Sequence, residues 1–493
     1  MISVSDQDYL KSYWRFQLHR TAGLLRALMR NRMSLVGLVI LILSSFVALA
    51  APLITPYHDI EQVAGPHAQP EWVMNFPDGY YLSKNLVVVN DPLFSSPASL
   101  RAWAFSGSRQ DLSNLILSYA PGTADPTTHA VGSVQLSHPT QGMAKAGLNQ
   151  TFRYPYKGPP ASFLGTVSVL ATGATEAHPI HVRVFIDQLG GLVFNLWDVN
   201  VTQSGNWTRP QGSRMETWPD KPRGSTGLSD AEVIFSAVQD YTYGIEVGFD
   251  GVQTLDITNL QLSLPGTAWG LFGTDNGGND LLTRDLLGTP SSMLVGLTSA
   301  LLGIGVGLLI GLLAGLLGGI VDQVLMRVTD LMLTIPFLPL AIILTVILTP
   351  SALTIIMIIA FFSWMGFARV IRSQVLTLRE RPFIEAARAA GAGNVRILTK
   401  HLFPNLVGLT YVNLALSVPG AILTYAALAF LGLGDPTVES WGRILNDNFI
   451  VGGTHYWWWV IPPGLSIALV SLSFVLIGYA LDEMFNPKLR KRR

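Results

Sequence analysis

The sequence of 493 residues contains no cysteine and few charges. The lack of cysteine excludes disulfides, thiolate metal sites and cysteine nucleophiles, so the polar block between the first two hydrophobic runs must be held together by packing alone. Charged residues make up 13% of the chain and hydrophobic residues 49%, which argues against a purely soluble protein. No G-x-x-x-x-G-K-[ST] sequence is present to cradle nucleotide phosphates. We expect no catalytic residue, no metal site, no cofactor in this chain and no nucleic-acid partner.

The sequence contains long hydrophobic runs with few charged residues. Six windows are each long enough to span a bilayer, which takes roughly 20 residues. They lie at Met33–Leu53, Met293–Leu317, Val328–Leu348, Ala352–Ile371, Leu406–Leu431 and Trp458–Leu481. About thirty polar and basic residues precede the first window, too many for the n-region of a signal peptide, so we expect an uncleaved span there.

The neutral net charge hides an asymmetry between the polar block that follows the first window and the rest of the chain. Residues 57–280 hold 11 Lys and Arg against 20 Asp and Glu, whereas the remainder holds 21 against 12. Basic residues mark the cytoplasmic side of a membrane protein. An even number of spans places both termini on one side. We therefore predict a multi-pass protein of the cell membrane with both termini in the cytoplasm and the polar block outside it.

These observations divide the chain into five parts. The expected parts are a cytoplasmic interfacial helix at 1–32, a first span at 33–56, a β-rich insert outside the cytoplasm at 57–270, a core with five spans at 271–485 and a basic cytoplasmic tail at 486–493. The first part mixes aromatic and leucine side chains with basic ones, as in a helix that lies in the membrane interface and contacts lipid. A solvated arm is the alternative.

The insert carries short alternating apolar runs separated by Gly, Pro and Asp, which predict an all-β sandwich. The predicted strands are Phe163–Ala171, His181–Gln188, Leu192–Val201, Glu232–Val238, Tyr243–Phe249 and Leu255–Leu264. The last two resemble the closing hairpin of jelly-roll carbohydrate-binding modules. Three sequons, at Asn149, Asn200 and Asn206, agree with an external location and are possible glycosylation sites. Five tryptophans either fill the core, which is the commoner use, or stack on a sugar: Trp72, Trp103, Trp197, Trp207 and Trp218.

A basic stretch at residues 379–405 lies between the fourth and fifth windows. Pro382 suits the first turn of a helix, because its missing N–H would have no partner there. Gly391 then ends that helix at little cost, and Pro404 begins the next one. Alanines between Pro382 and Gly391 let another surface approach closely. We therefore predict a short helix that lies beneath the membrane on its cytoplasmic side.

Glycine and proline are patterned within the windows. The second window repeats glycine every four residues, which permits close packing between helices in lipid; the repeat is Gly303, Gly307, Gly311, Gly315 and Gly319. Pro336 and Pro339 in the third window and Pro419 in the fifth interrupt helical hydrogen bonding. Backbone groups freed in this way find protein partners or face water.

Several of these motifs match one family. Glu385-Ala386-Ala387 with Gly391 and Pro404-Asn405 is similar to the EAA loop of bacterial and archaeal ABC importer permeases, which docks on a separate ATPase subunit. Further matches are Gly273-Thr274-Asp275, Gly278-Asn279-Asp280 with Asn279 in place of an arginine, Phe430-Leu431-Gly432-Leu433-Gly434, Ser440-Trp441-Gly442 and Leu445-Asn446-Asp447. Residues 1–56 and about 270–493 resemble the second-permease type of the dipeptide and oligopeptide ABC importers. The insert lies outside this resemblance.

The resemblance implies the six-helix fold of type I ABC importers and a set of partners. These are a second, homologous permease subunit, two ABC ATPase subunits that hold ATP and Mg²⁺, and an extracytoplasmic binding protein that delivers cargo. The implied ATPase-coupling residues are Glu385, Ala386, Ala387, Arg388, Gly391 and Pro404. The implied residues of the translocation path are Pro336, Pro339 and Pro419, and those of the external loop are Trp441, Gly442, Asn446 and Asp447.

We expect di- or oligopeptides as cargo, with oligosaccharides or metal chelates as alternatives. A different class of function is a membrane-anchored carbohydrate-active or carbohydrate-binding protein whose external part does the work. Its paired carboxylates would be Asp230 and Glu232, or Asp250 and Asp256. A channel or ion-coupled carrier is disfavoured, because the central parts of the windows contain essentially no ionisable residue.

Overall fold

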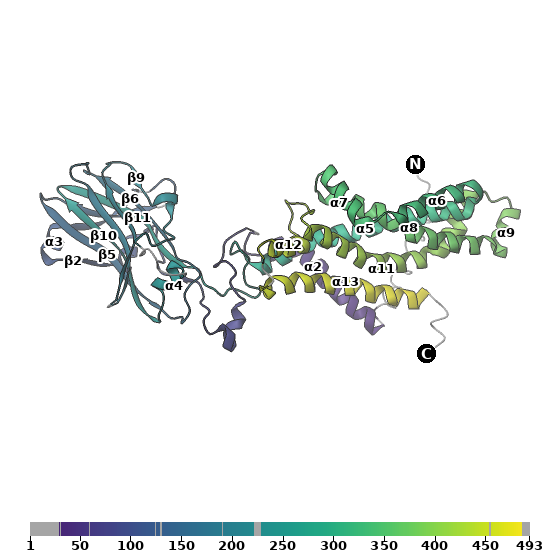
Figure 1. Ribbon diagram of the computed structural model, residues 1–493, viewed down its shortest axis with the longest axis horizontal. Coiled ribbons are helices and arrows are strands. Elements are labelled where there is room, and N and C mark those ends of the chain that lie inside the picture. Colours follow the sequence, from purple (N-terminus) through teal and green to yellow (C-terminus); the bar gives the residue numbers. More distant parts are fainter. Residues whose placement is uncertain are drawn as a thin grey trace, which may run out of the picture. The chain divides into compact units, whose positions relative to one another are not determined.

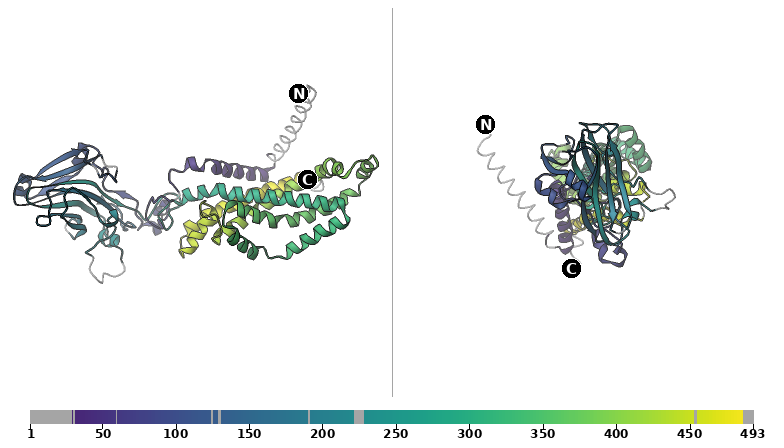
Figure 2. Two further views of the ribbon diagram at one scale, coloured as in Figure 1. Left: turned by 90° about the horizontal axis from the view of Figure 1, so that it is seen from above. Right: turned by 90° about the vertical axis from the view of Figure 1, so that its left-hand side faces the viewer.

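The computed structural model describes residues 29, 31–58, 60–123, 125–128, 131–189, 191–220, 228–452 and 455–485. The chain divides into two compact units, a helical unit of residues 1–59 with 282–493 and an insert unit of residues 60–281. Figures 1 and 2 show the helices and the strands of the two units. The predicted interfacial helix and basic tail fall almost wholly outside the described residues.

Ten α-helices and one π-helical segment make up the described part of the helical unit. Helix α5 is included whole, although its first residue, Leu281, belongs to the insert unit. They are α2 (Arg32–Ile54), α5 (Leu281–Leu317), α6 (Gly319–Thr334), α7 (Phe337–Leu348), α8 (Ala352–Arg379), α9 (Pro382–Ala389), α10 (Asn394–Ile397), the π segment η5 (Leu398–Leu402), α11 (Phe403–Phe430), α12 (Trp441–Ile450) and α13 (Trp457–Phe485). In the described residues, five helices are long and apolar enough to cross a membrane, or up to six if the bent pair α6 and α7 forms one span.

The third predicted window is not one straight helix. Helix α6 ends at Thr334, and α7 begins at Phe337 after a bend of 89°. Pro336 lies at this break, where it caps the start of α7, and Pro339 occupies the first turn of that helix. A proline disfavours helical backbone in the residue before it and lacks the N–H for the preceding turn, so the chain turns here. Pro419, by contrast, does not break its helix, because α11 continues through it.

The glycine repeat forms the contact between α5 and α8. A Cβ atom on Gly307 would lie 2.6 Å from the carbonyl oxygen of Trp364, and one on Gly311 would lie 2.6 Å from that of Ala368. Only glycine permits so close an approach of the two backbones. The fifth glycine of the repeat, Gly319, is not part of α5, because that helix ends at Leu317 and Gly319 has a φ of +55°.

Pro404 lies in the first turn of α11, so the prediction that it begins a helix is confirmed. The helical backbone also continues upstream of α11, and Asn394–Phe430 is one apolar helix that includes η5. Pro404 has no N–H to donate to the carbonyl one turn earlier, and a proline ring crowds that carbonyl. The turn before it widens accordingly, and the N–H of Phe403 donates to the carbonyl of Leu398.

The helical unit has its own apolar core. Helix α11 packs along α13, and α2 packs on the other side of α13, where a Cβ on Gly37 would lie 2.8 Å from the carbonyl oxygen of Ser473. Buried side chains from α5, α7, α8, α11, α12 and α13 meet in one cluster, which includes Ile422, Tyr425 and Trp441. Figure 1 shows α11, α12 and α13 side by side.

The insert unit contains two antiparallel sheets. Its strands are β1 (Leu86–Val87), β2 (Ala104–Gly107), β3 (Ile116–Pro121), β4 (Gly132–His138), β5 (Met143–Tyr154), β6 (Leu164–Thr172), β7 (Ile180–Gln188), β8 (Val193–Val201), β9 (Trp207–Thr208), β10 (Gln239–Asp250) and β11 (Gln253–Leu264). One sheet has the order β3-β4-β11-β6-β9 with β1 beside β11, and the other has the order β2-β5-β10-β7-β8. The short helices are α3 (Arg109–Asn114), α4 (Asp230–Ile234), and the 3-10 turns η1 (Glu71–Asn75), η2 (Pro77–Gly79), η3 (Pro97–Ala102) and η4 (Gln211–Ser213).

Both sheets contribute alternate residues to a single hydrophobic core. Leu136, Val169 and Ile257 of one sheet lie in the same buried cluster as Val184 and Ile245 of the other. Each of these side chains is fully buried. Successive side chains of a strand point to opposite faces, so alternate residues of each sheet lie in the core.

Two predictions for the insert are wrong. The strands β10 and β11 do not pair as a hairpin, because β10 lies between β5 and β7 while β11 lies between β4 and β6. The chain crosses from one sheet to the other at Gly251, whose φ is +115°. The predicted strand at Glu232–Val238 begins as helix α4 instead. Ser229 and Glu232 form a capping box there, and the S-x-x-E pattern of that box is visible in the sequence.

Candidate functional site

The short helix predicted beneath the membrane is α9. It begins at Pro382, which occupies the first helical position as expected. At its end Gly391 adopts a φ of +81°, a conformation that side chains with a Cβ rarely take. The N–H of Gly391 donates to the carbonyl of Arg388 at 2.9 Å, and the N–H of Ala392 donates to that of Ala387 at 3.0 Å. These two bonds close the end of the helix, as in a Schellman motif, so Gly391 fixes the direction in which the chain leaves α9.

One side of α9 is anchored and the other is exposed. Ile384 is fully buried in a cluster with Leu308 and Leu312 of α5 and Ile371 and Val375 of α8. Ile397 and Leu402, beyond the glycine, are buried in the same cluster. By contrast, Glu385, Ala386, Arg388 and Gly391 are exposed and Ala387 is half-buried. Helix α9 is therefore fixed to the bundle through Ile384 and leaves most of its other residues exposed.

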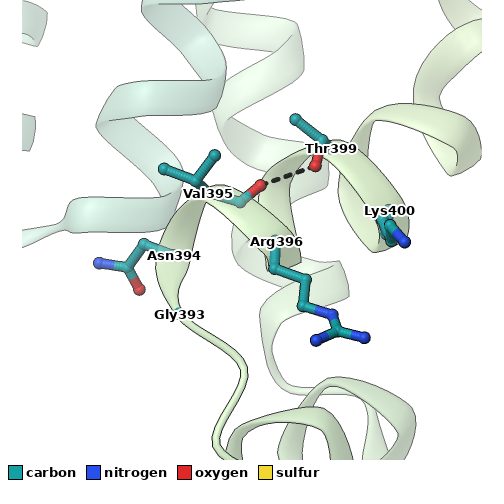
Figure 3. Close-up of a pocket in the computed structure, with 6 residues that line it drawn as sticks. All are labelled: Gly393, Asn394, Val395, Arg396, Thr399 and Lys400. Carbon is teal, nitrogen blue, oxygen red and sulfur yellow. Dashed lines mark hydrogen bonds between the residues drawn. The ribbon is translucent and has the colours of Figure 1, made fainter. Parts of the chain in front are cut away.

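Next to α9, the start of α10 forms a shallow hollow at the surface. It is lined by Gly393, Asn394, Val395, Arg396, Thr399 and Lys400. Figure 3 shows Arg396 and Lys400 extending from this short helical segment, and the hydroxyl of Thr399 donates to the carbonyl of Val395 at 2.8 Å. Val395 is 78% exposed. The hollow is therefore lined by both apolar and basic residues.

Ion pairs connect α8, the helix that leads into α9, to α6. The guanidinium of Arg372 contacts both carboxylate oxygens of Asp322, with Nε 2.5 Å from Oδ1 and Nη2 2.6 Å from Oδ2. Arg369 pairs with Asp330 one turn away. The predicted site does not include these residues, because a sequence read alone does not show which acid an arginine on another helix meets.

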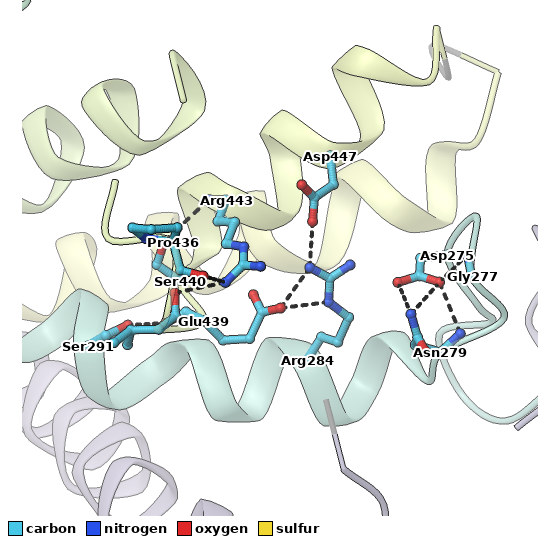
Figure 4. Close-up of polar contacts among 11 residues, drawn as sticks. Asp275, Gly277, Asn279, Arg284, Ser291, Pro436, Glu439, Ser440, Arg443 and Asp447 are labelled. Carbon is cyan, nitrogen blue, oxygen red and sulfur yellow. Dashed lines mark hydrogen bonds and ion pairs between the residues drawn. The ribbon is translucent and has the colours of Figure 1, made fainter. Parts of the chain in front are cut away.

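A second cluster lies at the opposite end of α5, where Arg284 meets two carboxylates. Its Nε and Nη2 lie 2.9 and 2.7 Å from Oε1 of Glu439, and Nη2 lies 2.6 Å from Oδ2 of Asp447 (Figure 4). The side chains of Arg284 and Glu439 are 6% and 5% exposed. Burial raises the pKa of Glu439, and the nearby Arg284 opposes that rise. Neither Arg284 nor Glu439 is among the predicted site residues.

The predicted external-loop residues take structural positions around this cluster. The indole N–H of Trp441 donates to the carbonyl of Asp285 at 3.2 Å, and Asn446 donates to the carbonyl of Phe430 at 2.6 Å. A Cβ on Gly442 would lie 2.4 Å from the carbonyl oxygen of Ala426, so α12 rests directly on α11. The loop is therefore a packed support for the end of the bundle.

In the insert unit, several predicted residues also have defined contacts. Asn149 donates to the hydroxyl of Ser106 at 2.9 Å, while Asn200 and Asn206 are exposed. Asn279, which stands where the related motif has arginine, donates to Oδ2 of Asp275 at 2.8 Å. Among the described residues, no group of three or more His, Asp or Glu is placed to hold a metal ion.

The carboxylates proposed for an enzyme make local contacts within the insert unit. Glu232 closes the capping box of α4, and Asp230 accepts a hydrogen bond from the backbone N–H of Trp218 at 2.9 Å. Asp250 pairs with His178, and Asp256 is buried and accepts from Ser133 at 3.0 Å. Each of the four carboxylates therefore has a partner within the insert unit.

Two family models match the chain. The binding-protein-dependent transport system inner membrane component matches residues 307–491, and the N-terminal TM domain of oligopeptide transport permease C matches residues 21–70. The dipeptide transport system permease protein DppC of Bacillus subtilis is 36% identical over 230 residues, which cover 46% of this chain and 72% of that protein.

Solved structures align with parts of the chain. The MetNI methionine ABC transporter in an inward-facing conformation aligns with 20% identity and a TM-score of 0.34, covering 42% of this chain and 95% of that one. TmCBM61 in complex with β-1,4-galactotriose aligns with 14% identity and a TM-score of 0.23, covering 36% of this chain and 97% of that one. The sequence identity and coverage carry the assignment: the chain belongs to the family of binding-protein-dependent transport permeases that includes the bacterial dipeptide and oligopeptide permeases, and it is a multi-pass protein of the cytoplasmic membrane.

Proposed function

We propose that this chain is one of two related permease subunits of an ABC importer that brings di- and oligopeptides into the cell. The names of its relatives support a peptide as cargo. Because the chain has no phosphate-cradling loop, ATP and Mg²⁺ would be held by two partner ATPase subunits. An extracytoplasmic binding protein would deliver the peptide. The chain itself performs no catalysis in this proposal.

Helix α9 is the single observation that carries this proposal. Its exposed residues Glu385, Ala386, Arg388 and Gly391, together with Ala387, form the surface on which an ATPase would dock. When ATP closes two ATPase subunits, each would push such a helix, and Ile384 would pass the displacement to α5 and α8. Rigid movement of packed helices then switches the pore between inward- and outward-facing states. Pro404 would contribute to this coupling through η5, the widened turn that connects α10 to the long helix α11.

The proposed topology treats α6 and α7 as one broken span, which gives six spans and places both termini in the cytoplasm. The bend at Pro336 and Pro339 would then lie along the translocation path, as would Pro419. Trp441, Gly442, Asn446 and Asp447 would support the extracytoplasmic end. The insert would be a β-sandwich outside the cytoplasm, because its two sheets share one core.

We propose further that the insert serves the importer as an outer scaffold that docks the binding protein or covers the pore entrance. Removal of residues 60–280 with a short flexible linker, in the intact assembly, tests this role. A large loss of affinity for the binding protein supports docking. Unchanged affinity and unchanged transport would reject both roles.

The cargo is tested by reconstitution of the complete assembly in vesicles. We expect ATP-dependent uptake of labelled di- and oligopeptides, and no uptake of labelled oligosaccharides or nickel chelates. Uptake of an oligosaccharide without peptide competition would overturn the peptide assignment. Turnover of glycans by the purified full-length chain would instead favour an enzyme.

A further inference from the structure

The insert unit carries an exposed aromatic tip on residues 71–81. Within it Trp72 is 42% exposed, Phe76 57%, Tyr80 52% and Tyr81 69%. The rings of Trp72 and Phe76 meet edge to face, with centroids 6.1 Å apart, and those of Tyr80 and Tyr81 do so at 5.2 Å. Four large aromatic side chains left this exposed in one short segment mark a surface that something else covers.

The tip is a compact structure and not a loose loop. It consists of η1 followed directly by η2, and the second turn folds back on the first. At Gly79 a Cβ would lie 2.1 Å from the carbonyl oxygen of Val73, so only glycine allows this fold. The aromatic side chains are therefore held outward on a fixed support, which reduces the entropy lost when they are buried.

Hydrogen bonds tie the tip to the segment that precedes α5. The indole N–H of Trp72 donates to the carbonyl of Leu271 at 3.0 Å, and the N–H of Glu71 donates to that of Gly270 at 2.9 Å. Two residues further on, the carbonyl of Gly273 accepts from the N–H of Leu281 at 3.1 Å. Leu281 is the first residue of α5. Two residues span at most about 7 Å, so the tip lies close to the start of this helix.

The height of the start of α5 can be compared with that of the start of α13. Within the bundle, the hydroxyl of Ser466 on α13 donates to Oδ2 of Asp285 at 2.9 Å, so these two residues are level. Leu281 is four residues, or about 6 Å, further out than Asp285, and Trp457 is nine residues, or about 13 Å, further out than Ser466. Trp457 begins the aromatic run that suits the outer interface. Leu281 is thus no further from the bilayer centre than this run.

We propose that the aromatic tip, with Trp72, Phe76, Tyr80 and Tyr81, inserts into the headgroup region of the same bilayer that α2 and α5 cross, and so holds the insert unit against the lipid surface. Tryptophan and tyrosine favour this region because they present an apolar body and a polar group. Charge is balanced around the tip. Glu71 pairs with Lys84, Lys157 lies 3.9 Å from the ring centroid of Tyr80, and Asp78 supplies a second acid. Attachment therefore rests on aromatic burial and does not require anionic lipid.

The absence of cysteine permits a direct test on the full-length chain. Single variants Phe76→Cys and Tyr81→Cys are spin-labelled and reconstituted in phosphatidylcholine vesicles, with Met143→Cys as the matched control. Met143 is 87% exposed and pairs with Asp250, next to the crossing that leads into β11. Strand β11 is roughly 35 Å long, so Met143, near its first residue, lies about that distance from Leu264, its last residue. Oxygen, which partitions into lipid, and a water-soluble nickel chelate then compete to relax each label.

We expect oxygen to relax the labels at positions 76 and 81 more strongly than the nickel chelate, and the reverse at position 143. Added salt or phosphatidylglycerol should leave these ratios unchanged. Equal ratios at all three positions would overturn the proposal. So would shielding of positions 76 and 81 that appears only when partner subunits are added, because the tip would then be a protein interface. Ratios that collapse in salt would also contradict it, since charge would be holding the segment.

Discussion

Arg284 and Glu439 lie 155 residues apart in the sequence and form a buried ion pair, with the guanidinium Nε 2.9 Å and Nη2 2.7 Å from Oε1. The pair joins the first turns of α5 to the loop before α12. Asp447 contacts the same guanidinium from within α12. One arginine therefore holds together three segments at the end of the bundle, and the cluster is sensitive to the loss of any one charge.

Replacement of Arg284 by methionine should destabilise the helical unit by about 3 to 5 kcal/mol, because Glu439 would be left buried and charged without its partner. Thermal unfolding in detergent measures this. Arg443→Met is the control, since Arg443 is on α12 but donates to the carbonyl of Pro436 at the surface. The double variant Arg284→Met with Glu439→Gln should recover part of the loss. Equal effects of the two arginine variants would contradict this account.

The pH dependence of stability should contain a contribution from Glu439. Burial raises its pKa above the ordinary value of 4.5, so the folded state binds the proton more tightly than the unfolded chain. Stability from this group is then highest below pH 4.5 and falls as the pH rises towards the raised pKa. Glu439→Gln should remove that fall from the unfolding profile. An unchanged profile would show that the carboxylate is ionised throughout.

In the insert unit, Asp125 should contribute in the opposite sense. Its carboxylate is fully buried. Burial opposes ionisation, but hydrogen bonds from Arg209 and Thr127 outweigh it and lower the pKa of Asp125 to about 2. The contribution, about 2 kcal/mol, is present above pH 3.8 and is lost as the pH falls towards 2. Arg209→Met should reduce this acid sensitivity, and Arg214→Met, at an exposed ion pair, should leave it intact.

The glycines of α5 permit a comparison within one helix. Gly307→Ala places a methyl group 2.6 Å from the carbonyl oxygen of Trp364, which should force α5 and α8 apart and cost about 1 to 3 kcal/mol. Gly305→Ala on the same helix meets nothing within 4 Å and should be neutral or slightly stabilising. Unfolding of the two variants in one detergent measures the difference. Equal stability would show that the helices are not packed as closely as the structure shows.

The sequence predicts features that depend on local signals. Pro382 and Gly391 mark the ends of the short helix within one or two residues, because helix caps act over a single turn. Long apolar runs likewise predict the spans, and alternation predicts five of the eleven strands in the described part of the insert: β6, β7, β8, β10 and β11. Each of these signals lies within the segment that it specifies.

Features set by distant partners could not be predicted in the same way. The crossing at Gly251 looks like a hairpin in the sequence, and only the pairing of β5 and β4 with the flanking strands shows that it joins two sheets. Arg284 meets Glu439 through the packing of α5 against the loop before α12. The sequence also does not predict η5, the widened turn before Pro404, because that turn depends on a helix that continues upstream of the proline.

The central claim is that α9 passes the work of ATP hydrolysis to the pore, and Gly391 tests it most directly. Gly391 and Gly432 both have left-handed backbones, with φ of +81° and +77°, and both follow the end of a helix. A Cβ atom added to either glycine would have no neighbouring atom within 4 Å. Valine at either site therefore imposes similar backbone strain, about 1 to 2 kcal/mol, without a clash.

In vesicles with the complete assembly, Gly391→Val should leave ATP hydrolysis running while peptide uptake is lost. The substitution would change the direction in which the chain leaves α9, so the movement of the ATPase subunits would no longer be transmitted to the bundle. Gly432→Val, the matched control, should keep the ratio of peptide imported to ATP hydrolysed. That ratio is the measurement. An unchanged ratio in the Gly391→Val assembly would contradict the account.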